Sequence, residues 1–415
     1  MKITTKILWA FALLAATVFT SCKDDDNDIP MCEAVWTLTL PEDVAGGTLT
    51  DMTASFTNIN TSTEYTDATI TDVAGGGLTV SATVPEGLYR VSVEGKLTYT
   101  LNGQATSTGV RAYRESVMIT GQTATLPAAQ LSFFSPSTGF VIEEIFFTGT
   151  TTPTGDQYSN DQYFKITNNS SEVLYADGLA ILESQFMTVQ KEDYTPDLMK
   201  DAFTVDFVFV IPGSGTEHPV EPGASIIVAL TGIDHRTGNP NSFDLSTADF
   251  EFYDESPNPQ FQDIDSPSVP NLDKWYSSTA SYTNLHNRGF HSYALAKMGV
   301  DKETFLRDYT YTAEWLFVFE EYEFPMSGDY YYVPNSWIVD AVNLSIDALF
   351  EWIVTDPSLD AGWTHCGSID KDPARYNKSV RRKVESTTAD GRRILKDTNN
   401  STADFEADAT PSLLE

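Results

Sequence analysis

Cysteine, histidine and positive charge are scarce in this 415-residue sequence, which holds three cysteines, five histidines, and 25 Lys and Arg residues against 59 Asp and Glu residues. After Cys22, only Cys32 and Cys366 remain, nearly the whole chain apart. That spacing gives neither a disulfide framework nor a zinc-ligand motif. One long-range disulfide and two unpaired thiols both stay open.

The scarcity of basic residues excludes one class of partner. The formal net charge is −34, and a surface of that sign repels phosphates. Without a basic stripe interleaved with aromatic residues, we expect no nucleic acid partner. The chain is nevertheless 41% apolar and 12% aromatic, which is ample for a packed core. The charge therefore predicts a folded acidic protein rather than a disordered one.

The first 21 residues have the layout of a secretory signal peptide. A short basic start precedes an apolar run over residues 7–19, which is too short to span a bilayer. The segment that ends at Cys22 resembles a lipobox, with Phe19 where Leu is usual, a departure common in the phylum Bacteroidota. The resemblance implies that residues 1–21 are removed and that Cys22 is acylated, which anchors the chain to a membrane.

An acidic tether follows over residues 22–32. Its first residues are Lys23, Asp24, Asp25 and Asp26. Such a segment cannot bury itself and extends into water. It resembles the surface-export signal of the same phylum, which implies an outer-membrane, lipid-anchored protein that faces the cell exterior.

The rest of the chain predicts an all-β fold in two domains. Residues 33–135 contain alternating segments bounded by turn formers, such as 36–40, 88–94 and 113–119. Around the turn at 84–87 they resemble immunoglobulin-like or prealbumin-like sandwich modules, which implies a spacer. A composition change at 135–136 ends this domain.

Residues 136–415 predict a second, larger β-sandwich or open barrel, with insertions near 185–204 and 249–285. Expected strands lie at 141–147, 162–167, 179–182, 205–211, 225–230, 292–296, 315–319 and 338–342. Seven residues in the basic segment 378–396 are expected to lie on two antiparallel strands and to pair with neighbouring acids.

The order of short motifs in this second region carries a resemblance. The motifs are the Ile142–Ile145 strand, Asn168-Asn169-Ser170, the Pro222-Gly223 turn, Asn287-Arg288-Gly289, the strand Trp337–Val342 and the segment Asp397–Phe405. They resemble a lamin-tail-type immunoglobulin-like domain and, more closely, an uncharacterised family of Bacteroidota lipoproteins. That family is thought to accompany TonB-dependent receptors, which implies a role in nutrient capture, although fold analogy does not carry function.

Two aromatic clusters are candidate binding residues. One closes the acidic insertion at Trp275 and Tyr276, and the other contains Tyr330, Tyr331 and Tyr332. Such rings combine a large contact area with a polar edge and suit sugar stacking or receptor contact. Filling the core is the alternative for most of them.

The candidate metal ligands have a weaker basis in the sequence than the aromatic candidates. Asp156 and Asp161 lie in an oxygen-rich segment that suits calcium but lacks the EF-hand order. His286 and His291 offer imidazoles at a spacing that matches no closed zinc site. We expect no resident cofactor, with calcium as the open alternative.

Catalysis by a nucleophile and its base requires serine or cysteine beside histidine. None of the five histidines lies in a recognisable motif, and the segment 213–215 lacks the context of a nucleophile elbow. The sequence therefore predicts a non-enzymatic binding or accessory module. A hydrolase of glycans or peptides would need groups converging in one deep pocket. A metal or metal-complex binder would need the histidines or the acidic loop to meet at one point.

Overall fold

The computed structural model describes residues 29–414, apart from 42–43, 45, 74–75, 102–103, 135–138, 257, 280 and 320–321. The predicted signal peptide, Cys22, the export signal and the domain boundary at 135–136 lie outside the described residues. β-strands are the predominant regular structure of the described chain and helices are few and short, which confirms the predicted all-β fold. Among its helices, none has the length and hydropathy to span a membrane.

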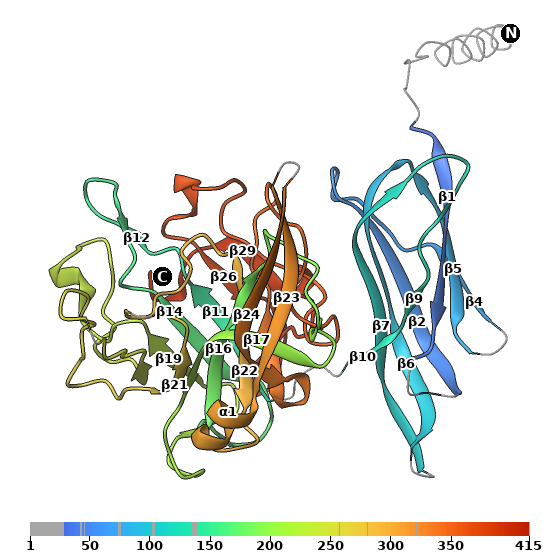
Figure 1. Cartoon of the computed structure of the whole chain (residues 1–415). Coiled ribbons are helices and arrows are strands. Elements are labelled where there is room, and N and C mark those ends of the chain that lie inside the picture. Colours follow the sequence, from blue (N-terminus) through green and yellow to red (C-terminus); the bar gives the residue numbers. More distant parts are fainter. Residues whose placement is uncertain are drawn as a thin grey trace, which may run out of the picture.

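Residues 31–134 form a first body, a sandwich of two sheets (Figure 1). One sheet has the order β4-β5-β1-β8, with β9 also on β1, and the other has the order β10-β7-β6-β2-β3. The strands are β1 (Met31–Thr39), β2 (Gly47–Asn58), β3 (Glu64–Tyr65), β4 (Ala68–Asp72), β5 (Leu78–Pro85), β6 (Gly87–Leu101), β7 (Gln104–Ile119), β8 (Thr123–Thr125), β9 (Ala129–Gln130) and β10 (Ser132–Phe134).

The core of this body forms from side chains that alternate between buried and more exposed positions along the strands. Every second residue of β5 is buried, so one face of the strand meets the facing sheet. Trp36 and Phe56 are fully buried between the sheets, and Trp36 Nε1 donates to the carbonyl of Pro127 at 3.0 Å. The largest ring of the core therefore leaves no polar atom unsatisfied.

The second body, from Phe140 onward, contains two larger sheets. The first has the order β20-β19-β14-β11-β26-β29 and consists of β11 (Phe140–Phe146), β14 (Tyr163–Asn168), β19 (Ser225–Ala229), β20 (Phe250–Glu251), β26 (Ser379–Arg382) and β29 (Phe405–Ala409). The second has the order β23-β24-β17-β16-β22-β25, with β21 also on β17, and consists of β16 (Leu179–Met187), β17 (Ala202–Val210), β21 (Asp273–Ser277), β22 (His291–Lys297), β23 (Thr310–Phe319), β24 (Tyr322–Pro334) and β25 (Ile338–Val342).

Short elements complete the second body. They are the strand pairs β12 (Thr150–Thr151) with β13 (Gln157–Tyr158), β15 (Leu174–Tyr175) with β18 (Pro219–Val220), and β27 (Val384–Thr387) with β28 (Arg393–Leu395), the helices α1 (Lys302–Asp308) and α2 (Ser401–Asp404), and the 3-10 turns His235–Thr237, Asn335–Trp337, Pro373–Arg375 and Ser412–Leu414.

The two large sheets pack face to face. Ile142 and Phe164 from one sheet meet Phe207 and Tyr293 from the other in a single buried cluster. The larger sheet is covered on its outer face as well, where Phe305 of α1 packs on β16, β17 and β22. Burial on both faces explains why residues 179–184 are all buried and do not alternate.

Cys32 and Cys366 do not form a disulfide with each other. Cys32 is buried in the core of the first body, and Cys366 is buried in the core of the second. The sequence left open either one long-range disulfide or two unpaired thiols, and the structure contains two unpaired thiols.

The predicted insertions are partly built into the sheets. The first is narrower than residues 185–204, because β16 continues to Met187 and β17 begins at Ala202. The second, near 249–285, supplies β20, which pairs with β19, and β21, which pairs with β17. Both segments therefore contribute to the sandwich.

Three of the seven predicted basic residues pair with acids, namely Arg381, Arg382 and Arg393. The segment lies on three strands, β26, β27 and β28, rather than on the two that were predicted, and one of its arginines is buried. Arg382 is 3% exposed. Its guanidinium donates to both carboxylate oxygens of Asp340 at 2.7 and 2.8 Å and to Asp397 at 3.1 Å, and Asp404 lies at 3.7 Å. Burial raises the pKa of Asp340, while Arg382 opposes that shift.

This ion cluster joins both sheets of the second body. Arg382 Nε donates to the carbonyl of Ile142 at 2.9 Å, and Asp340 accepts from the backbone N–H of Ile142 at 2.6 Å. Asp340 lies on β25 of the larger sheet, whereas Ile142 and Arg382 lie on β11 and β26 of the smaller one. The cluster therefore fixes one side of the sandwich.

Arg111 of β7 connects the two bodies. It is 2% exposed and donates to the carbonyl of Thr398 at 2.6 Å and to the carbonyl of Pro357. Across the first body's sheet it stands in register with Glu94. Because Thr398 directly follows Asp397, the contact between the bodies depends on the loop that the ion cluster holds in place.

Replacing Arg382 with Met should destabilise the second body by about 3–5 kcal/mol, because three carboxylates lose their buried counter-charge. The loss should be larger at pH 8 than at pH 5, since the uncompensated carboxylates can take up protons at lower pH. Arg381→Met in the same strand is the control, and its partner Glu406 lies 4.0 Å away at the surface. Equal effects of both substitutions on urea unfolding would contradict the role given to Arg382.

Candidate functional site

Strand alternation separates the predicted aromatic residues. Tyr331 packs on Tyr276 with ring centroids 4.2 Å apart, and Trp275 packs on Phe305 of α1 at 6.0 Å. These three predicted residues thus help to cover the outer face of the larger sheet, beneath α1. Tyr332 lies on Tyr309 at 5.6 Å.

Tyr330 belongs to a different group, which we call the aromatic row: Phe186, Tyr194, Trp315, Tyr330 and Trp352. Phe186 stacks on Tyr194 at 4.1 Å and contacts Tyr330 at 5.4 Å and Trp352 at 6.3 Å. Tyr194 continues to Trp315 at 5.4 Å. The row therefore joins β16, the loop after it and the segment after β25 to the hairpin formed by β23 and β24.

The hairpin continues past the row into an exposed apolar end. Its exposed apolar side chains, which we call the hairpin tip, are Leu316, Phe317, Val318, Tyr322, Phe324 and Met326. These side chains are 38% to 57% exposed. Phe317 and Phe324 face each other across the two strands with ring centroids 6.3 Å apart.

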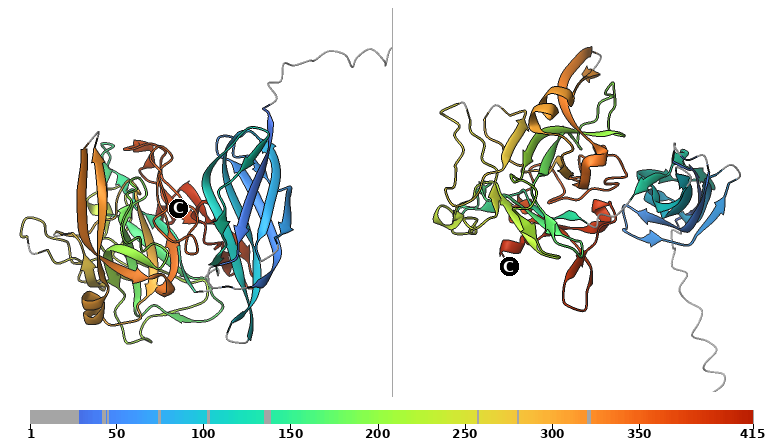
Figure 2. Two further views of the ribbon diagram at one scale, coloured as in Figure 1. Left: turned by 45° about the vertical axis from the view of Figure 1, so that its right-hand side comes forward. Right: turned by 90° about the horizontal axis from the view of Figure 1, so that it is seen from below.

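Sheet pairing explains why the hairpin protrudes. β24 pairs with β17 only over residues 331–334, so the part from Tyr322 to Tyr330 pairs with β23 alone. The right view of Figure 2 shows the hairpin extending beyond the rest of the second body. An isolated hairpin is marginal in water, and cross-strand aromatic pairs together with the row at its base stabilise it.

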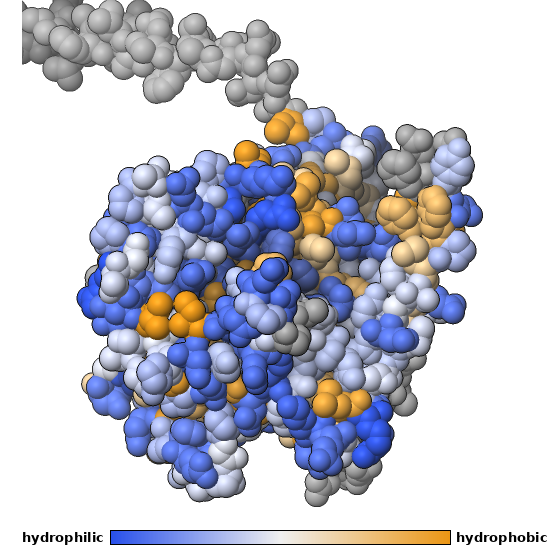
Figure 3. Space-filling model, turned by 60° about the vertical axis from the view of Figure 1, so that its left-hand side comes forward, coloured by the Kyte–Doolittle hydropathy of each residue, from blue (hydrophilic) through white to orange (hydrophobic). Residues whose placement is uncertain are grey.

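Figure 3 shows one face of the molecule, on which apolar side chains form small separate patches among hydrophilic residues. Scattered apolar residues of this kind are normal, whereas a contiguous exposed group marks an interaction site. The hairpin tip is such a group.

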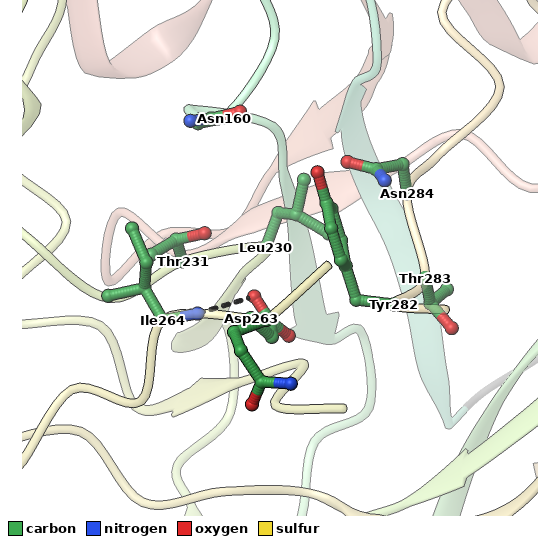
Figure 4. A pocket seen from close by; sticks show the side chains of 9 residues that line it. Asn160, Leu230, Thr231, Asp263, Ile264, Tyr282, Thr283 and Asn284 are labelled. Atoms are coloured by element: carbon green, nitrogen blue, oxygen red, sulfur yellow. Dashed lines mark hydrogen bonds between the residues drawn. The ribbon is translucent and has the colours of Figure 1, made fainter. Parts of the chain in front are cut away.

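A polar pocket lies where the acidic insertion packs on the second body (Figure 4). It is lined by Asn160, Leu230, Thr231, Gln262, Asp263, Ile264, Tyr282, Thr283 and Asn284. Its volume of about 60 Å³ suits a few water molecules, whereas sites for organic ligands measure about 300–1,000 Å³. Burial raises the pKa of Asp263 to about 6, and its carboxylate accepts from the backbone N–H of Ile264.

The predicted metal candidates do not meet at one point. Asp156 lies in an exposed turn and accepts from Thr154, whereas Asp161 is buried and accepts from Ser242 at 2.6 Å. His286 and His291 come together elsewhere, with ring centroids 5.2 Å apart. His291 Nδ1 donates to the carbonyl of Ser184 at 2.6 Å.

In the part of the chain that the structure describes, three metal-ligand side chains converge at one place, Asp177, Glu217 and His218. No spacing of residues in the sequence predicts this group. Burial raises the pKa of Asp177, but the backbone N–H groups of Glu217, His218 and Gly215 lower it more, to about 2. These N–H groups donate to both carboxylate oxygens, so Asp177 organises the loop that carries Glu217 and His218.

The fold defines an all-β protein with two sandwich bodies and a protruding aromatic hairpin. A family model described as a protein of unknown function, DUF4876, matches residues 221–412. A solved structure of a DUF4876 family protein from Bacteroides thetaiotaomicron VPI-5482 is similar to this chain, with a TM-score of 0.54 and 21% identity. That similarity covers 92% of this chain and 96% of the other, so it shows the fold of both bodies.

Among curated proteins, none matches this chain. The predicted resemblance to an uncharacterised Bacteroidota family agrees with the family match and with the similar structure.

Glu183 gives a pH-dependent prediction. It is buried beside Tyr293, and burial raises the pKa of its carboxyl to about 7. Because the folded state holds this proton more tightly, its contribution to stability is present below pH 4.5 and is lost as the pH rises through 7. Glu183→Gln should remove the dependence, so that the variant gains about 2–3 kcal/mol relative to the natural chain between pH 5 and pH 8 in urea unfolding.

The control for this measurement is Asp156→Asn, in an exposed turn. A constant difference between Glu183→Gln and the natural chain from pH 5 to pH 8 would show that Glu183 does not titrate in this range.

Proposed function

We propose that this chain is a lipid-anchored outer-membrane protein that faces the cell exterior and acts as a non-enzymatic binding or accessory module. The lipobox resemblance at Cys22 supports the anchor. The observation that carries the binding role is the exposed hairpin tip, mounted on the aromatic row. The face-to-face sheets of the second body support its proposed assignment as a lamin-tail-like domain.

The position of the anchor supports a partner at the membrane. β1 begins at the end of the first body toward which the hairpin tip also points, in Figure 1 and in the left view of Figure 2. The nine residues from Cys22 to Met31 reach at most about 30 Å when extended. A chain held at Cys22 would therefore present the hairpin tip toward the membrane that anchors it.

A protein of that membrane is the partner that this orientation favours. Aromatic side chains on a projecting element are the usual anchors of protein interfaces. A TonB-dependent receptor is the partner that the family resemblance implies. Its outer loops would lie at the membrane surface, which the hairpin tip faces in this orientation. In this orientation the first body lies beside the second body and would set the lateral distance between the lipid anchor and the hairpin tip.

Side-chain engagement supports the non-enzymatic role. His235 has both ring nitrogens within hydrogen-bond reach of Tyr158 and Thr231, at 2.8 and 2.9 Å. His365 Nδ1 lies 2.9 Å from the carbonyl of Gly367. These hydrogen bonds join the two imidazoles to a tyrosine hydroxyl and to backbone carbonyls, whereas an activated nucleophile needs a serine hydroxyl or cysteine thiol hydrogen-bonded to the imidazole.

Cells that display the full chain allow a direct test. A photo-reactive amino acid at Phe317 should cross-link to one outer-membrane protein, and the same probe at Met118, an exposed apolar position of the first body, should not. Cys22→Ala should abolish the cross-link, because the chain is no longer held at the membrane. Equal cross-linking from both positions, or none from Phe317, would count against the hairpin tip as the binding surface.

Thermal shift separates the alternative functions. The chain from residue 29 onward would be screened with calcium and zinc salts, haem and a glycan panel. Stabilisation that scales with one ligand and disappears in His286→Ala or Asp161→Asn would favour a metal binder over the proposed module.

A further inference from the structure

The outer edge of β23 is open along the protruding part of the hairpin. β23 is the last strand of its sheet and pairs as a strand with β24. Near its middle, Glu314 exchanges two backbone hydrogen bonds with Thr195, at 2.8 and 2.9 Å, so its N–H and C=O point away from β24.

Backbone groups alternate in direction along a strand, so Leu316 and Val318 also point their N–H and C=O groups outward. Within the described ranges, neither residue has a backbone partner on that side. An open strand edge of this kind is a template for another strand.

The opposite edge of the hairpin is protected by proline. Pro325 stands opposite Leu316 in a pair that exchanges no hydrogen bonds, so its nitrogen faces the outer edge of β24. Because proline has no N–H, it interrupts that edge. β23 contains neither proline nor glycine. The hairpin therefore blocks strand addition on one side and permits it on the other.

Charge and hydropathy define the strand that would fit. Leu316 and Val318 are exposed and apolar, whereas Glu314 and Glu323 flank them with negative charge. Between Phe319 and Tyr322 the sequence adds two further glutamates, Glu320 and Glu321, and it contains no Lys or Arg from residue 308 to 370. A second copy of this chain, or an anionic lipid surface, would bring like charges together, whereas basic flanks on a partner strand would be attracted.

We propose that β23 binds its partner by strand addition, in which an extended segment with alternating apolar side chains and Lys or Arg at its ends prolongs the seven-stranded sheet. The inference rests on the proposed function and specifies the partner of the same hairpin. Backbone hydrogen bonds to Leu316 and Val318 supply affinity, while the acidic flanks select for a basic partner.

Two substitutions at one position test strand addition. Leu316→Pro removes an outward N–H that β24 does not use, whereas Leu316→Ala keeps this N–H and removes the same side chain. The probe is a ten-residue peptide of alternating valine and threonine with two lysines at each end. The comparison peptides carry glutamates at the ends, or two central prolines with the lysines retained.

In fluorescence anisotropy, the lysine-flanked peptide should bind the natural chain and Leu316→Ala with similar affinity. It should bind Leu316→Pro at least about tenfold more weakly, because the loss of a single hydrogen bond corresponds to about a tenfold change in affinity. Both comparison peptides should bind weakly. Equal binding to Leu316→Pro, or equal binding of the proline-containing peptide, would overturn strand addition. Circular dichroism confirms that both variants are folded.

The cellular cross-link separates this inference from the proposed function. If the probe at Phe317 still cross-links at full strength in the Leu316→Pro background, strand addition is wrong while the hairpin remains the binding surface. A dimer in sedimentation, or flotation with lipid vesicles, that depends on Leu316 would also overturn the basic partner strand. No cross-link in any background counts against the proposed function itself.

Discussion

The buried contact between Arg382 and its carboxylates holds the second body in shape. Asp340 ties it to the larger sheet and the backbone of Ile142 ties it to the smaller one. Asp397 extends the cluster into the loop that receives Arg111 from the first body. Such a contact is strong because the charges are shielded from water, and removal of one partner leaves the others unpaired. The direction of the first body relative to the second depends on this chain of contacts.

The protruding hairpin can act as a binding surface because a rigid body holds it in place. The aromatic row fixes the base of the hairpin, so the tip is held away from the sandwich although no sheet supports it. Exposed Phe317 and Val318 cost free energy in water, and a partner that covers them recovers it. Attachment at Cys22 would place that surface close to the membrane, where a receptor is concentrated next to it. Anchoring and binding then act together, because the tether raises the local concentration of the hairpin.

Strands were predictable where residues alternate or form short apolar runs, as in 88–94 and 205–211. The site was less accessible, because it depends on which face of a strand meets which neighbour. Tyr330, Tyr331 and Tyr332 look equivalent in sequence, yet one joins the row and one the outer core. Phe186 and Tyr194 come from one segment and Trp352 from another that lies far from it in the sequence, and no shared pattern links the two. Arg382 is indistinguishable from Arg381 until the pairing of β26 shows which side chain points inward. The aromatic character of 315–337 was visible, whereas the open edge of β23 requires knowledge of its last pairing partner.

The most direct test of a preformed, unoccupied binding edge is residue-resolved amide hydrogen exchange in the isolated chain. Trp315 and Phe317 donate toward β24, and their amides should exchange slowly, whereas the amides of Leu316 and Val318 should exchange close to the rate of an unprotected peptide. Protection of all four amides would mean that the edge is already paired, and fast exchange of all four would mean that the hairpin is not formed. Either result would contradict a preformed edge that awaits a partner.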